Sequence, residues 1–339
     1  MSIQRVGIIG TGAWGTTFAQ VLADAGRDVI MWGRNEEIVG QIQSGSNQRY
    51  LPGIRLSPKI TATTDRSEVT TDVDLLVVVL PTQVIRETLE PFRDLISPET
   101  PILSLSKGLE RGTLKLVTDV ISEAAGVELY RVAALSGPNL SREIIEKHPT
   151  ATVVASTSED LAAEIAEACH NSYFRPYVST DLVGVEVAGA TKNVIAVAVG
   201  AAEGMGWGSN TRTTLITRGL AEMTRFGIAL GAHPDTFAGL AGMGDLIATC
   251  SSKLSRNFSF GFRMGQGLSK EEAQALSIGV VEGAATAGPL VRQARKLGVD
   301  MPISEAVSAV INEGADLTAT GRELLDRPRK RDGWRDRLV

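Results

Sequence analysis

The N-terminus of the chain places an apolar run, a glycine-rich turn and a helix-like segment in direct succession. Residues 6–9 lead into Gly10-Thr11-Gly12-Ala13-Trp14-Gly15, and apolar side chains then recur at helical spacing up to Ala25. In a G-x-G-x-x-G turn the first glycine permits the tight bend, the second lets N–H groups approach a pyrophosphate, and the third allows close helix packing. We therefore expect Gly10, Gly12, Ala13, Trp14 and Gly15 to bind a dinucleotide.

The residues that follow favour this interpretation over a glycine turn without a ligand. Gly26 stands where a residue just past a helix end is expected, and residues 29–32 predict a second strand. The apolar run at 74–80 is typical of a strand buried on both faces of a parallel sheet. Thr82 is expected to cap the helix after it. Further strands are predicted at residues 102–105 and 132–135.

The second part of the chain changes character. Helical patterns rich in Ala, Leu, Ile and Val are predicted at residues 183–202, 213–230, 269–276, 284–296 and 303–312. A chain of 339 residues also exceeds what one hydrophobic core usually supports. We expect an α/β protein with a Rossmann-type nucleotide-binding domain at 1–181 and an all-helical substrate-binding and catalytic domain at 182–339. The charged residues 328–339 are expected to form a solvated tail.

Composition excludes several function classes. Lysine and arginine total 34 against 39 acids, so the net charge of −5 gives no basic surface for nucleic acid. No apolar run reaches the roughly 20 residues that cross a bilayer, and no metal-ligand cluster is expected. The only cysteines, Cys169 and Cys250, are far apart in sequence, which favours a reducing compartment and a cytoplasmic location.

Polar turns follow two of the predicted strands. Ser106-Lys107-Gly108 follows one, and Ser136-Gly137-Pro138-Asn139 follows another. Ligands of open α/β sheets bind beyond the carboxyl ends of the strands, so these turns should face the cofactor. Lys107 is the notable residue, although a solvated lysine in a turn remains the common alternative.

Lys192 and Asn193 lie near the middle of an otherwise small and apolar helix. Partial burial would lower the pKa of Lys192 and suit it to donate a proton to a carbonyl oxygen. The alternative is a lysine whose stem covers apolar surface while its ammonium reaches water. Asp245, after a glycine-rich turn, could cap a helix, bind a substrate hydroxyl or orient Lys192. Ser255-Arg256-Asn257 could hold a phosphate or be a charged surface turn.

These motifs, in this order, resemble the bacterial NAD(P)-dependent glycerol-3-phosphate dehydrogenases. The resemblance rests on Gly10-x-Gly12-x-Trp14-Gly15-Thr16, Ser106-Lys107-Gly108-Leu109-Glu110, Ser136-Gly137-Pro138, Lys192-Asn193, Gly242-Met243-Gly244-Asp245 and Ser255-Arg256-Asn257. It implies reduction of dihydroxyacetone phosphate to sn-glycerol 3-phosphate, the backbone precursor of glycerophospholipids. The implied catalytic residues are Lys192, the proton donor, with Lys107 and Asp245.

The resemblance also implies ligand contacts. The implied substrate-binding residues are Lys107, Gly137, Asn139, Lys192, Asp245, Ser255, Arg256 and Asn257. The implied cofactor contacts outside the glycine turn are Lys107, Ser141, Arg256, Val280 and Glu282. Asn139 and Ser141 depart from the family pattern, in which a Thr or Ser and a small Ala are usual.

The second strand ends in Gly33-Arg34-Asn35 and lacks the acid that usually accepts the ribose 2′-hydroxyl of NAD. Arg34 can pair with a 2′-phosphate, which favours NADP(H) and leaves NAD(H) use open, because arginine also stacks on adenine. The alternatives are a dehydrogenase of 3-hydroxy acids or phosphogluconate, whose substrates carry a carboxylate, and a non-catalytic NADP(H) sensor. The sequence also leaves a homodimer open.

Overall fold

The computed structural model describes residues 3–327 and contains an eight-stranded sheet in the order β3-β2-β1-β4-β5-β6-β7-β8. All neighbouring strands are parallel except β6 and β7. The strands are β1 (Arg5–Ile9), β2 (Asp28–Trp32), β3 (Ile60–Thr63), β4 (Leu75–Val78), β5 (Ile102–Ser104), β6 (Val132–Ser136), β7 (Thr150–Ser156) and β8 (Phe174–Ser179). The five predicted strands are confirmed, although the one expected at 74–80 is shorter.

Helices cover both faces of the sheet. They are α1 (Ala13–Asp24), α2 (Glu36–Gln43), α3 (Arg66–Thr70), α4 (Ile85–Leu89), α5 (Val117–Ala125), α6 (Ser141–Ile145) and α7 (Glu159–Cys169). One core packs the sheet against α1, α2, α6 and α7, and a second packs the opposite face against α3, α4 and α5. Alternate residues of each strand, such as Ile8 and Ile9, enter opposite cores. We call residues 3–181 the sheet half.

The glycine turn between β1 and α1 has the predicted form. Gly10 has a φ of +127°, and a Cβ there would lie 2.2 Å from the carbonyl oxygen of Val79. A Cβ on Gly15 would lie 2.4 Å from the carbonyl oxygen of Gly10, so the third glycine does permit close packing. A Cβ on Gly12 would meet no atom within 4 Å. The middle glycine therefore faces open space, as a pyrophosphate site requires.

The expectation that Thr82 caps a helix is wrong. Thr82 is the first residue of a short 3₁₀ helix, Thr82–Val84, whose N-cap is Pro81, and α4 begins three residues later. The Thr82 side chain is buried and caps nothing, while its backbone N–H donates to Glu282 Oε1 at 3.4 Å. The backbone N–H of Thr82 is therefore satisfied by a carboxylate 200 residues away in the sequence, and not by a local capping side chain.

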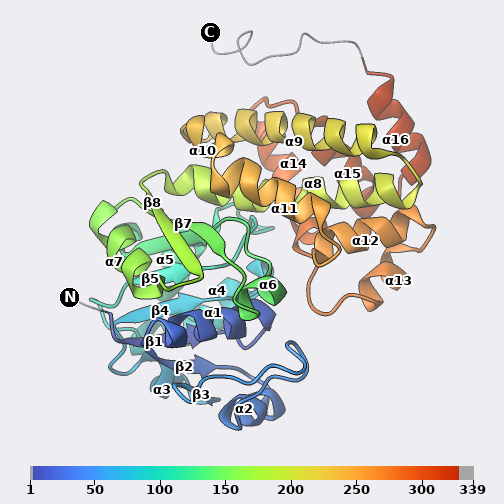
Figure 1. Ribbon diagram of the computed structural model, residues 1–339. Helices are drawn as coiled ribbons and strands as arrows, with labels where there is room; N and C mark the ends of the chain where they lie inside the picture. The colour runs from blue at the N-terminus through green and yellow to red at the C-terminus, as the bar shows by residue number, and fades with distance from the viewer. Residues whose placement is uncertain (1–2, 328–339) are drawn as a thin grey trace.

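Residues 182–327, the helical half, contain the second set of elements (Figure 1). The helices are α8 (Leu182–Gly204), α9 (Ser209–Ala229), α10 (Asp235–Ala238), α11 (Asp245–Ser251), α12 (Arg256–Gly265), α13 (Lys270–Ala275), α14 (Glu282–Lys296), α15 (Pro302–Glu313) and α16 (Leu317–Leu325), with a π-helical turn at Leu240–Gly244. The five predicted helices are confirmed. The expected tail at residues 328–339 lies outside the described residues.

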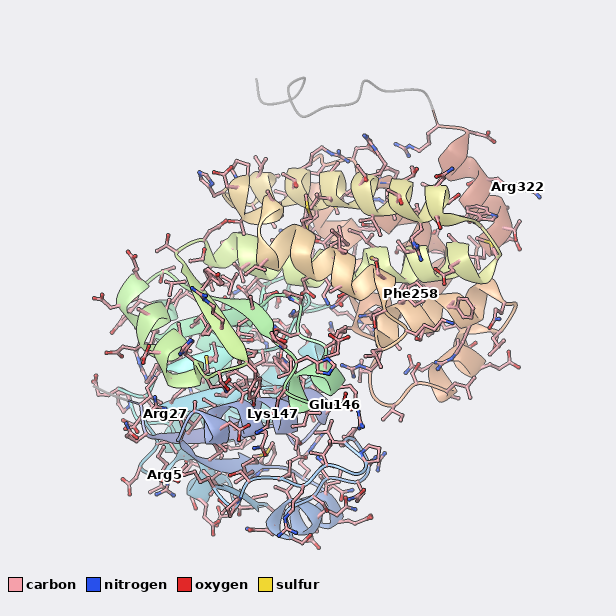
Figure 2. The ribbon with its side chains drawn as sticks, in the orientation of Figure 1. Arg5, Arg27, Glu146, Lys147, Phe258 and Arg322 are labelled. Atoms are coloured by element: carbon pink, nitrogen blue, oxygen red, sulfur yellow. The ribbon has the colours of Figure 1, made fainter. Side chains whose placement is uncertain are left out.

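Helix α8 is the central element of the helical half. A Cβ on Gly200 would lie 2.1 Å from the carbonyl oxygen of Phe258, and one on Gly261 would lie 2.0 Å from that of Val197. The two glycines thus allow the backbones of α8 and α12 to approach closely, and Phe258 is labelled on α12 in Figure 2. By length and composition α8 could cross a bilayer, but 89% of its most apolar window is buried inside the protein. It is a core helix.

Candidate active site

Three segments bring an ion triad together where the sheet half meets the helical half. Asp245, the first residue of α11, lies with Oδ2 2.6 Å from Lys107 Nζ and with Oδ1 3.1 Å from Lys192 Nζ. Lys107 comes from the turn after β5, and Lys192 from the middle of α8. Asp245 does not cap α11, because the N-cap of that helix is Gly244, and its carboxylate contacts Lys192 directly.

Burial sets the electrostatics of this triad. The Lys192 side chain is only 10% exposed, so it does not extend into water as the alternative required. Burial lowers the pKa of Lys192 to about 8, an effect that the Asp245 carboxylate opposes and the Lys107 ammonium reinforces. Burial alone would raise the pKa of Asp245, but the two lysines outweigh it and hold that pKa below its ordinary value. The site therefore holds a carboxylate beside a lysine that can exchange a proton near neutral pH.

Sequence reasoning did not assign a role to Thr249, which completes the site. Lys192 Nζ donates to Thr249 Oγ1 at 2.6 Å, and the hydroxyl donates to Asp245 Oδ1 at 3.2 Å. Asp245 and Thr249 are four residues apart on α11, so they share one helix face. That spacing is the signal that could have found the residue. Two fixed acceptors thus orient the Lys192 ammonium.

Lys107 is held from both halves. Its ammonium donates to the backbone oxygen of Gly137 at 3.3 Å as well as to Asp245. Its stem lies against α8 at Gly189, where an added Cβ would lie 3.2 Å from Lys107 Cγ. Gly137 itself has a φ of +147°, a conformation that favours glycine. The structure therefore places the predicted residue Gly137 beside the triad, in contact with Lys107.

The first residues of α12 combine structural and exposed groups. Ser255 is the N-cap of α12, and its Oγ accepts from the N–H of Phe258 at 3.2 Å. Asn257 is buried, donates to Asn193 Oδ1 at 2.7 Å and accepts from the N–H of Gly283 at 2.9 Å. The Arg256 side chain is exposed and makes no hydrogen bond with any residue in the described part of the chain. Its guanidinium is therefore free to contact a ligand.

The predicted late cofactor segment lies beside Arg256. A Cβ on Gly279 would lie 3.0 Å from Arg256 Nη1, and the neighbouring Val280 is 39% exposed. Burial raises the pKa of Glu282 to about 7, while Arg256 and the N–H of Thr82 act in the opposite direction. Glu282 Oε2 is buried without a hydrogen-bond partner. The segment connects the helical half to the end of β4.

The remaining predicted residues surround the glycine turn and β6. Asn139 Nδ2 donates to Thr152 Oγ1 at 3.1 Å, which directs this side chain toward β7. Ser141 begins α6, and its backbone oxygen accepts from Thr17 Oγ1 at 3.4 Å, so it touches α1. The Trp14 ring packs on Phe18, with centroids 5.8 Å apart. Arg34, at the end of β2, is exposed.

The residues at the glycine turn fit a dinucleotide cofactor. Gly12 is the N-cap of α1 and leaves open space above it, and no side chain caps the first turn of that helix. Free N–H groups at a helix N-terminus favour a pyrophosphate. The turn, Arg34 and Lys107 all lie at or beyond the carboxyl ends of parallel strands, where dinucleotides bind in such sheets.

Comparison with known proteins gives a consistent picture. Models of the NAD-dependent glycerol-3-phosphate dehydrogenase N-terminus and C-terminus match residues 5–162 and 181–321. A glycerol-3-phosphate dehydrogenase [NAD(P)+] of Streptomyces griseus is 47% identical over 327 residues, 96% of this chain and 97% of that protein. One of Thermobifida fusca is 48% identical over 312 residues, 91% of this chain and 93% of that protein. The crystal structure of glycerol-3-phosphate dehydrogenase from Coxiella burnetii superposes with a TM-score of 0.91 at 35% identity, covering 96% of this chain and 99% of that one.

Proposed function

This chain belongs to the family of NAD(P)-dependent glycerol-3-phosphate dehydrogenases, oxidoreductases that act on a CH–OH group, and we propose that Lys192 is its proton donor. The reaction interconverts dihydroxyacetone phosphate and sn-glycerol 3-phosphate with NAD(P)H. The observation that carries the assignment of Lys192 is the triad with Asp245 and Lys107, buried between the two halves. Bound cofactor supplies the hydride.

Lys192 suits the proton transfer because its pKa of about 8 lies near the working pH. In reduction its ammonium stabilises the developing alkoxide and gives up a proton to it. In oxidation the neutral amine takes that proton back. Asp245 and Thr249 act as positioning residues, since each contacts the Lys192 ammonium. Lys107 adds a second positive charge at the reacting carbonyl.

We propose that the substrate phosphate binds at the start of α12. Ser255 Oγ satisfies the N–H of Phe258, which leaves the N–H groups of Arg256 and Asn257 free at the helix N-terminus. We propose that these N–H groups and the Arg256 guanidinium together bind the phosphate. Asn257 fixes this site on α8 through Asn193. Phosphate bound here contributes remote binding energy that orients the carbonyl toward Lys192.

The other contacts are proposed with the same roles that the sequence suggested. Gly137 and Asn139 would line the substrate side of the turn after β6. Ser141, Val280 and Glu282 would contact the cofactor with the glycine turn. We propose the boundary between the two domains at residues 181 and 182, and the change from β8, which ends at Ser179, to α8, which begins at Leu182, supports it. Cys169 and Cys250 are both free and buried, which supports a reducing, cytoplasmic location. A role in glycerophospholipid synthesis and a homodimer also remain proposals.

The decisive experiment follows NADPH oxidation at 340 nm with purified protein and dihydroxyacetone phosphate. Unphosphorylated dihydroxyacetone is the control. We expect turnover only with the phosphorylated substrate. Binding of NADPH without turnover of either compound would contradict the proposed reaction and leave a dehydrogenase of a carboxylate-bearing substrate or a nucleotide sensor as the explanation.

A further inference from the structure

Thr11, between the first two glycines of the turn, contacts two segments that each carry an exposed arginine. On one side it packs against the end of β2 so tightly that a Cβ on Gly33 would lie 2.7 Å from Thr11 Oγ1. Arg34 follows Gly33 directly. On the other side, the Thr11 backbone oxygen accepts from Asn47 Nδ2 at 3.0 Å, and Arg49 lies two residues further on. Thr11 therefore fixes the backbone segments from which both arginine side chains extend.

The segment that carries Arg49 is rigidly attached. Asn47 is fully buried and also donates to Thr16 Oγ1 at 2.8 Å, so it connects this segment to α1. The backbone oxygen of Asn47 accepts from the N–H groups of Tyr50 at 3.2 Å and Leu51 at 2.8 Å, which closes a tight turn around Arg49. A buried amide thus holds the turn on the nucleotide-binding element.

Both arginines are available for a ligand. Arg34 and Arg49 are exposed, and within residues 3–327 neither makes a hydrogen bond or an ion pair. The Arg49 guanidinium lies over the Tyr50 ring, 5.7 Å from its centroid. The nearest acids in sequence to Arg34 are Glu36 and Glu37, in the first turn of α2. Among the residues that the structure describes, neither forms an ion pair with Arg34, and Glu37 Oε1 instead accepts from Gln41 Nε2 within the helix.

We propose that Arg49 is a second specificity-determining residue, which binds the 2′-phosphate of NADP(H) together with Arg34. A single arginine at this place can stack on adenine and serve NAD(H) equally well. Two arginines carried by segments that flank Thr11 instead match a phosphate that carries close to two negative charges and three acceptor oxygens. The inference rests on the proposed function only in requiring that a dinucleotide binds at the glycine turn.

The test measures cofactor binding without substrate, from the fluorescence of NADPH and NADH titrated with protein. In Arg49→Ala we expect the Kd for NADPH to rise about ten-fold or more, as for a lost charged hydrogen bond, and the Kd for NADH to change less than two-fold. Arg49→Lys should lie between, because it keeps the charge without the planar fork. Arg175→Ala is the matched control, since Arg175 also lies over a tyrosine ring, at the opposite edge of the sheet.

Three results would overturn the inference: an equal effect of Arg49→Ala on both cofactors, no effect on either, or a similar loss in the Arg175 control. Turnover of dihydroxyacetone phosphate is measured in parallel on the unaltered protein. If the unaltered protein turns over dihydroxyacetone phosphate and Arg49→Ala binds both cofactors normally, the inference is refuted and the proposed function stands. If Arg49→Ala selectively loses NADPH binding but the unaltered protein shows no turnover, the inference stands and the proposed function is refuted.

Discussion

Replacing Asp245 by Asn tests the electrostatic argument most directly. The substitution keeps the shape of the side chain but removes the charge that lies 3.1 Å from Lys192 Nζ and 2.6 Å from Lys107 Nζ. A hydrogen bond between charged groups contributes about 1.5–3 kcal/mol, which corresponds to roughly a ten- to hundred-fold change in proton affinity. The pKa of Lys192 should therefore fall well below its present value of about 8.

The consequence for catalysis can be estimated. With a pKa of about 8, about three quarters of Lys192 is protonated at pH 7.5. A thirty-fold loss of proton affinity would leave about one tenth protonated. Reduction of dihydroxyacetone phosphate requires the ammonium, so its rate should fall roughly eight-fold from this effect alone. Asp245→Asn also removes the carboxylate that holds Lys107 at 2.6 Å, and loss of that contact should lower the rate further.

The assay is the pH dependence of kcat/KM in both directions. In the unaltered protein we expect reduction to decline, and oxidation of glycerol 3-phosphate to rise, as the pH increases through about 8. In Asp245→Asn both limbs should move to lower pH. Asp235→Asn, at an exposed acid of α10, is the matched control. NADPH binding checks that the variant is folded. A folded variant whose limbs stay near pH 8 would refute the reasoning.

Four further predictions follow from the same geometry. Lys192→Ala should lower kcat about 10²-fold or more, and near-normal turnover in a steady-state assay would exclude it as the proton donor. Arg256→Ala should raise the KM for dihydroxyacetone phosphate roughly ten-fold or more without lowering the melting temperature, and an unchanged KM would exclude it from the phosphate site. Thr249→Val should lower kcat more than it alters KM, with Thr249→Ser restoring it; equal activity of the two variants would show that the hydroxyl is not needed. Burial raises the pKa of Glu186 to about 7, so its stabilising contribution is complete below its ordinary pKa and is lost as the pH rises through 7. Glu186→Gln should therefore reduce the loss of melting temperature between pH 6 and pH 8, and an unchanged slope would contradict that pKa.

The strands missed by sequence analysis are β3, β7 and β8, of which β3 and β8 are the edge strands. β7 lies between β6 and β8, and polar residues at Thr150, Thr152 and Ser156 interrupt its apolar pattern. Edge strands are partly exposed, so β8 contains Arg175 and Pro176 and shows no continuous apolar run. The central strand β4 is buried on both faces and could be predicted from its apolar run alone. A continuous apolar run, which only the strands buried on both faces carry, determined which strands could be found.

The glycine-rich segment before Asp245 was predicted to be a turn but is helical. A Cβ on Gly242 would lie 2.3 Å from the backbone oxygen of Phe237, so the glycine serves close packing within a π-helical turn at Leu240–Gly244. Glycine at this position lowers local helix propensity, but it allows the turn to pack against the end of α10, five residues earlier in the sequence. The same packing places Asp245 at the start of α11, directed at two lysines that local sequence cannot connect to it.

The triad explains why the site requires both halves of the molecule. Lys107 lies 138 residues from Asp245 in sequence, and the two meet because the stem of Lys107 rests on α8 at Gly189. A buried carboxylate between two ammonium groups is stable only while all three remain in contact, since removing one leaves an uncompensated charge in a poorly solvated place. The contact between the halves and the protonation state of Lys192 are therefore coupled. A change that separates Lys107 from Asp245 weakens the contact between the two halves. It also removes the Lys107 charge that lowers the pKa of Lys192, so that pKa rises further above neutral even when Lys192 itself is unchanged.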